Sequence, residues 1–382
     1  MERSILAIFA ILAVQSTLAG NPAWEPKLSF HGTVGELASP NLIASITGNT
    51  TTIPNEHGLG DWVGIATGTG NADVQLWPEK TIRYCYEDDN TRSILNNDLM
   101  AAAQKWIDAG LDEDRFKYVE VSRTECTDNR PNVLLVKYSM PGPGPGQSSM
   151  FTTPAKIPAN GNLHGPTMTL TDDENMGMLD KVANYAHELG HAWGLVHEHQ
   201  NPYFWESALG GESGSTFGSH NFNCRNLKDY DRVQQDITNR INNDPNGLGE
   251  SQYGRHRQAV CKIRSVAGLY RFSAYDYLPM RVSETQQGAT TEDQIDWTSL
   301  MIYPSGAGGR PDGNPGAPDT RAYILMKPDG TPIAPVLNPN ANDVEGIKTM
   351  YSVGADPDDG PLLFEPRYKF NNAFKRNAVT SV

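Results

Sequence analysis

The 382-residue sequence has no excess of basic residues, few cysteines and, beyond its first twenty residues, no long apolar run. Lysine and arginine total 31 against 45 aspartates and glutamates, which gives a formal net charge of -14. Because binding to nucleic-acid phosphates needs a basic face, this balance argues against a nucleic-acid partner. No later stretch approaches the roughly eighteen apolar residues of a membrane helix, so we expect no stable membrane association of the mature chain. The sequence also has no internal repeat.

The cysteines number only four: Cys85, Cys126, Cys224 and Cys261. None of them forms the CxxC pair that is typical of cysteine-based metal sites. An even number in an exported chain indicates two disulfides, for which three pairings exist. We favour Cys85–Cys126 with Cys224–Cys261, because each pair then brackets a separate region.

Residues 1–19 have the features of a secretory signal peptide. Arg3 precedes the apolar run 4–14, and Thr17-Leu18-Ala19 leads to a cleavage point before Gly20. A retained membrane anchor is the alternative, but this apolar run is too short to span a bilayer. The sequence therefore predicts a secreted, extracellular protein.

Composition divides the remaining chain into three parts. Residues 20–72 are rich in Gly, Ser, Thr, Asn and Pro, which predicts a pro-segment or N-terminal extension without a core of its own. Residues 73–354 carry the periodic apolar patterns of a folded domain. Residues 355–382 are interpreted as a C-terminal tail.

Within the predicted domain, strands and one helix precede a second helix. We predict strands at 81–86, 116–121 and 133–138, a short edge strand at 167–171, helices at 92–109 and 180–194, helical pieces near 230–242, and a final helix at 343–351. This order indicates an α+β or α/β domain with a mixed sheet.

The most informative segment is His187-Glu-Leu-Gly-His191-Ala-Trp-Gly194-Leu-Val-His197. Residues four apart share one helix face, so His187 and His191 can direct two imidazoles at one point. Gly194 accepts the positive φ that lets the chain turn back and bring His197 to the same point. Three protein ligands leave a fourth position open for water, as in catalytic zinc sites. Glu188, beside the first ligand, can act as the base that activates this water.

Two alternatives to this interpretation concern the histidines themselves. They could simply pack in a core, but then the five fixed positions of the motif would have to coincide by chance. These positions are His187, Glu188, His191, Gly194 and His197. A fourth histidine, His199, is not expected to bind the metal, because it would block the open position.

The segment matches the metzincin zinc-binding signature, and Glu198 directly after the third histidine resembles the astacin-like zinc peptidases. Ser299-Leu-Met301-Ile-Tyr303, preceded by Asp296-Trp297, is similar to the Met-turn of that family. The resemblance implies a metzincin-type zincin fold of class α+β, with a mixed, mostly parallel sheet. The active-site helix would lie in an upper subdomain, and a loop-rich lower subdomain would carry the Met-turn and a C-terminal helix. The resemblance also implies one catalytic Zn²⁺ ion, with Met301 beneath its ligands and Tyr303 stabilising the oxyanion.

The chain departs from the family pattern at several positions. His199-Gln-Asn-Pro202 replaces the usual Arg-x-Asp-Arg-Asp after Glu198, Ile302 replaces a histidine, and the segment after Tyr203 is unusually long. These differences leave the substrate preference and the partner of Glu198 open.

The N-terminal extension contains one candidate latency residue. Astacin pro-segments often silence the zinc through the aspartate of a Phe-x-Gly-Asp motif, and Gly60-Asp61 keeps half of it. An ordinary turn aspartate is the alternative for Asp61.

The sequence therefore predicts a secreted zinc endopeptidase that cleaves extracellular polypeptides. The predicted ligands are His187, His191 and His197, with Glu188 as the base and Tyr303 at the oxyanion. Two other functions stay open: a zinc-containing binding or adhesion module without proteolytic activity, and a zinc hydrolase of a non-peptide amide or ester. Cleavage specificity and oligomeric state are left open.

Overall fold

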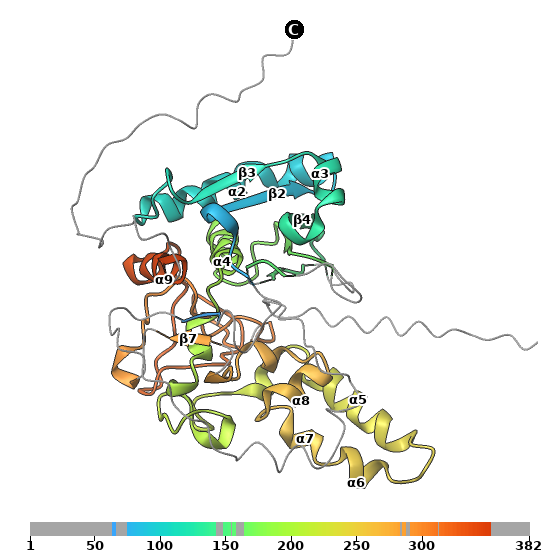
Figure 1. Cartoon of the computed structure of the whole chain (residues 1–382). Coiled ribbons are helices and arrows are strands. Elements are labelled where there is room, and N and C mark those ends of the chain that lie inside the picture. Colours follow the sequence, from blue (N-terminus) through green and yellow to red (C-terminus); the bar gives the residue numbers. More distant parts are fainter. Residues whose placement is uncertain are drawn as a thin grey trace, which may run out of the picture.

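A computed structural model describes residues 63–65, 75–142, 148–153, 155–157, 164–282, 285–287, 291–311 and 313–352 (Figure 1). The predicted signal peptide, Asp61 and the predicted tail lie outside the described residues, so these interpretations remain predictions.

A five-stranded sheet forms the upper part of the molecule in Figure 1. In spatial order its strands are β3 (Lys117–Glu120), β2 (Thr81–Tyr86), β4 (Leu134–Tyr138), β6 (Thr167–Leu170) and β5 (Phe151–Thr152). The first four run parallel to one another, and β5 runs antiparallel to β6. The sheet is thus mixed and mostly parallel, as predicted.

The prediction of an edge strand at 167–171 was wrong in its position within the sheet. Strand β6 lies between β4 and β5, and its Met168 and Leu170 are buried. The edge strand on this side is β5, which has only two residues. A segment that short shows no alternation of apolar and polar residues, so sequence periodicity cannot reveal it.

Two helices pack against each other beside the sheet: α2 (Asp89–Asp108) and α4 (Lys181–Trp193). Helix α2 begins before the predicted residue 92 because the carboxylate of Asp88 accepts a hydrogen bond from the Thr91 amide and caps the helix. The indole Nε1 of Trp106 in α2 donates to Ala186 O in α4 at 2.8 Å. This bond crosses the buried contact between the two helices.

After α4 the chain forms mainly short helices and loops. Helices α5 (Tyr230–Asn242), α6 (Gly249–Tyr253), α7 (His256–Ala259) and α8 (Arg264–Leu269) gather at the bottom of Figure 1, away from the sheet. Helix α5 confirms the helix predicted near 230–242. The remaining elements with a bearing on the site are the short helix α3 (Arg123–Asp128), the 3₁₀ helices η3 (Glu198–Gln200) and η7 (Ser273–Asp276), and the final helix α9 (Ala341–Ser352).

An aromatic cluster joins the end of α4 to the sheet and to α9. The Trp193 ring makes edge-to-face contacts with Phe116, Tyr118 and Tyr351, with centroids 5.4–5.5 Å apart. Nε1 of Trp193 also donates to the Tyr118 hydroxyl at 2.6 Å. Because such rings bury a large apolar area in a defined geometry, they anchor α4 against both elements.

The predicted disulfide pairing is confirmed: Cys85 is bonded to Cys126, and Cys224 is bonded to Cys261. The first links β2 to α3, and the second closes a loop that contains α5, α6 and α7.

The described part of the N-terminal extension is one short strand. Strand β1 (Val63–Ile65) pairs antiparallel with β7 (Thr285–Gln287), far along the chain, and lies against α9. None of the described helices is both long enough and apolar enough to cross a membrane.

Candidate metal site

Helix α4 positions the first two predicted ligands. Its N-terminus is capped by the Asp180 carboxylate, which accepts from the Ala183 amide at 2.8 Å. Its C-terminus ends at Gly194, where φ is +113°. That value lies in the left-handed region, which glycine adopts without a Cβ clash. The Leu195 amide then donates back to Gly190 O at 3.0 Å, and the chain reverses as the sequence predicts.

The reversal brings the three predicted histidines together. Their metal-binding atoms lie within 4.8 Å of one another, and all three side chains are fully buried. Nε2 of His191 is 3.0 Å from Nε2 of His187 and 3.2 Å from Nε2 of His197. Three nitrogens that share a tetrahedral zinc, at bonds of about 2.1 Å, would lie about 3.4 Å apart. The observed spacing therefore fits one zinc ion.

The opposite nitrogen of each ring has a protein acceptor. Nδ1 of His187 donates to Leu300 O at 2.8 Å, and Nδ1 of His191 donates to Leu195 O at 2.8 Å. Nδ1 of His197 faces Gln200 Oε1 at 3.0 Å. Because an acceptor requires the proton on Nδ1, each neutral ring presents the Nε2 lone pair to the common centre.

Three converging lone pairs repel one another unless a cation lies between them. Burial lowers the pKa of His191 to about 4, and burial followed by the nearby His191 holds the pKa of His187 and His197 well below the ordinary value. The rings are therefore neutral at pH 7, which is the form that binds metal. The donor set and its geometry fit Zn²⁺, for which three imidazoles and an open position are typical of catalytic sites.

The predicted Met-turn lies against the same helix. Its Met301 O accepts from the Glu198 amide at 3.0 Å. A Cβ atom at Gly190 would lie only 2.5 Å from Met301 Sδ and 3.0 Å from the Trp106 ring. Glycine at 190 thus lets the methionine approach α4 closely.

A buried carboxylate from α9 organises this turn. Asp343 accepts from Ser299 Oγ at 2.6 Å and from the Leu300 amide at 2.9 Å, and it is almost fully buried. Leu300 O also accepts the hydrogen bond from His187 Nδ1, so Asp343 supports this ligand indirectly, through Leu300. Burial raises the pKa of Asp343 to about 6.

The two other predicted site residues are also buried near the histidines. Glu188 follows His187 in α4 and is fully buried. The Tyr303 ring lies 4.1 Å from the His197 ring and 6.0 Å from the His187 ring, between centroids. The structure thus places both residues at the cluster, while their chemical roles stay predictions.

His199 stacks on His197 with centroids 5.1 Å apart, but its nitrogens are directed elsewhere. Nε2 donates to Asp276 O at 3.0 Å, and Nδ1 accepts from the Tyr303 amide at 3.4 Å. Burial lowers the pKa of His199 to about 3, so this ring is a neutral cross-link between the Met-turn and η7.

Sequence reasoning missed three residues that support the site: Gln200, Asp343 and His199 in its role as a cross-link. Their contacts with Tyr275, Ser299 and Tyr303 join residues that lie 44 to 104 positions apart along the chain. Gln200 lies only three residues after His197, but the carbonyls that orient its amide belong to Tyr275 and Leu278, which the sequence alone does not place nearby.

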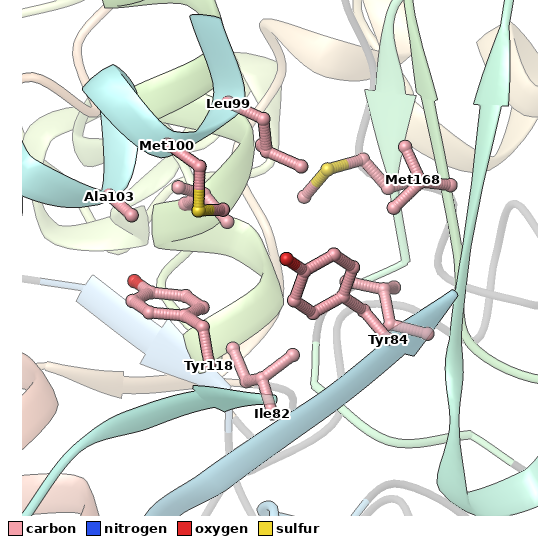
Figure 2. Close-up of a pocket in the computed structure, with 10 residues that line it drawn as sticks. Ile82, Tyr84, Leu99, Met100, Ala103, Tyr118 and Met168 are labelled. Carbon is pink, nitrogen blue, oxygen red and sulfur yellow. The ribbon is translucent and has the colours of Figure 1, made fainter. Parts of the chain in front are cut away.

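A small apolar cavity lies on the other side of α4, between α2 and the sheet (Figure 2). Figure 2 shows Met100 and Met168 beside the rings of Tyr84 and Tyr118, and Leu189 of α4 completes the lining. Leu189 is two residues from both His187 and His191 and so faces away from them. With a volume of about 10 Å³, the cavity has space for a single water at most and is not a substrate site.

No protein-family model and no curated protein sequence matches this chain. Among solved structures, it is similar to high choriolytic enzyme 1, a hatching-enzyme zinc protease from the medaka Oryzias latipes. The identity is 12%, the match covers 76% of this chain and 98% of that one, and the TM-score is 0.36. It is also similar to metalloproteinase-II from Bacteroides fragilis, with 14% identity over 33% of this chain and 47% of that one and a TM-score of 0.22. At scores this low, neither likeness identifies the activity, which has to be inferred from the site.

Proposed function

We propose that this chain is a secreted zinc-dependent endopeptidase that cleaves extracellular polypeptides. The observation that carries the proposal is the arrangement of His187, His191 and His197, each with Nδ1 anchored and Nε2 directed at one point. A site built only for stability needs a closed set of four ligands, whereas three histidines leave a position for water. The two disulfides are typical of proteins from oxidising, extracellular environments.

A bound zinc would acidify a water molecule and polarise the carbonyl of the scissile bond. Glu188 would accept a proton from the attacking water and later return it to the leaving amine. Its burial next to a ligand supports this role, because a carboxylate in a dry site interacts strongly with nearby positive charge.

Tyr303 stabilises the oxyanion of the tetrahedral intermediate by donating its hydroxyl proton in a hydrogen bond. Its ring packs beside the rings of two ligands, which supports a position next to the reacting carbonyl. The buried cross-link from His199 to the Tyr303 amide supports the same placement, because it fixes the backbone of this residue.

The test compares the secreted wild-type protein with Glu188→Gln on a peptide library read by mass spectrometry. The wild type should cleave peptides, lose activity with a chelator and recover it with zinc. Glu188→Gln should bind zinc normally yet turn over about 10² to 10⁴ times more slowly, because the amide cannot accept the proton. Glu174→Gln, at an exposed glutamate before α4, is the matched control and should keep wild-type activity.

An active Glu188→Gln protein would contradict the mechanism. Zinc-loaded wild type that cleaves no peptide would contradict the function and favour a binding module. Hydrolysis of simple esters or amides without peptide cleavage would favour a non-peptide hydrolase instead. The same mass spectra give the mature N-terminus and the cleavage preference.

A further inference from the structure

The chain returns to the metal site just after the long segment 203–269. Residues Tyr275–Met280 contact the turn that follows the third histidine. Asp276 O accepts from His199 Nε2 at 3.0 Å, and the Met280 amide donates to Gln200 O at 3.0 Å. We call Tyr275–Met280 the return segment.

Gln200 is the point where this return segment meets a metal ligand. Its side chain is fully buried. Nε2 donates to Tyr275 O at 3.2 Å and to Leu278 O at 3.3 Å. Oε1 lies 3.0 Å from Nδ1 of His197.

These contacts determine which end of the amide faces the histidine. Backbone carbonyls only accept hydrogen bonds, so the NH₂ group of Gln200 must point to Tyr275 and Leu278. Oε1 is then left for His197, and an oxygen there requires a proton on Nδ1. The Nε2 atom of His197 is therefore unprotonated and directed at the metal position.

We propose that Gln200 is a positioning residue for the ligand His197, and that the return segment fixes the Gln200 amide in the orientation that permits this. The return segment thereby contributes to metal affinity although none of its residues is a ligand. This inference rests on the proposed zinc site. It goes beyond that proposal because it assigns a supporting role to Gln200, which lies outside the zinc-binding segment His187–His197.

Gln200→Met provides the central test, because methionine has a similar length and flexibility but offers only a weak acceptor. We expect zinc to bind about 10 to 100 times more weakly, measured by competition with a chelating indicator. Gln234→Met is the matched control: its side chain also donates to a backbone carbonyl, Arg257 O at 3.1 Å, but lies in α5. Gln234→Met should bind zinc within about twofold of wild type, even if both substitutions lower the stability of the metal-free protein.

Gln200→Glu separates positioning from general packing. Its carboxylate can accept from His197 Nδ1 but cannot donate to the two carbonyls. We expect this variant to recover most of the zinc affinity lost in Gln200→Met while unfolding at a lower urea concentration. Equal zinc affinities for Gln200→Met and wild type would overturn the inference.

A measurement on the metal-free wild type covers the case in which neither variant folds. Long-range ¹H–¹⁵N spectra report the protonated nitrogen of each histidine. We expect His197 to be protonated at Nδ1 alone, and a His197 that populates the Nε2-protonated form would contradict the assigned orientation. A wild type that binds no zinc would instead contradict the proposed function, so the two failures are distinguishable.

Discussion

Helix α4 carries the first two ligands and the turn Glu198–Gln200 directly follows the third, but the helix and the turn are held in different ways. The geometry of α4 follows from its own sequence: Asp180 caps it, Gly194 ends it, and two ligands four residues apart share one face. The turn is a single 3₁₀ turn held by bonds from Met301 and the return segment. Local sequence therefore aligns two ligands, whereas tertiary contacts hold the third.

The largest effect is expected from removing one ligand in helix α4, His191, or the ligand before the turn, His197. His191→Ala and His197→Ala should each weaken zinc binding by roughly 3 kcal/mol, more than a hundredfold, since in structural zinc sites four protein ligands share about 10–16 kcal/mol of binding free energy. Hydrogen exchange of the metal-free proteins then separates the two regions. We expect the Met280 amide, which donates to Gln200 O, to exchange faster in His197→Ala only. Equal exchange of this amide in both variants would contradict the claim that the two regions are held in different ways.

A second prediction concerns Asp343, which supports a helix-borne ligand from a distant element. Its pKa of about 6 lies above the ordinary 3.8, so between these values the folded chain keeps a proton that the unfolded chain has lost. Stability should therefore fall as pH rises from about 4 to 6, by at most about 3 kcal/mol, and then level off. Asp343→Asn lacks this contribution.

The check is urea unfolding of both metal-free proteins between pH 4 and 7. The difference between the two curves isolates Asp343, because the buried histidines titrate in both proteins. Parallel curves would contradict the raised pKa.

The smallest effect is expected at the junction of the two regions. Gly194→Ala puts a Cβ atom on a residue with φ of +113°, which should cost about 1–2 kcal/mol of stability. Zinc affinity should fall as well. Leu195 O accepts the hydrogen bond that positions His191, and the chain reversal at Gly194 brings His197 to the metal site. Gly247→Ala, at φ of +67° in the loop before α6, is the control. It should lose stability without losing zinc affinity.

The extent of sequence prediction follows the same division. Helix α4, the pairing of Cys224 with Cys261 and the turn at Gly194 were predicted, because each depends on spacing or on a residue with a special backbone preference. The two-residue strand β5 was missed, since its length carries no periodic signal. Gln200 and Asp343 were missed because their polar partners come from segments that only the folded chain brings together.

The Cys224–Cys261 disulfide has a consequence for cleavage of the chain by peptidases. It closes a loop with a sequence separation of 37 residues, which contains α5, α6 and α7 and ends before the return segment. A single backbone cut inside this loop, at an exposed position such as Leu248, leaves the two pieces of the chain covalently joined. The return segment, which contacts Gln200, then stays covalently linked to the part of the chain that carries His197. A cut in the loop therefore does not release the segment that supports the third ligand.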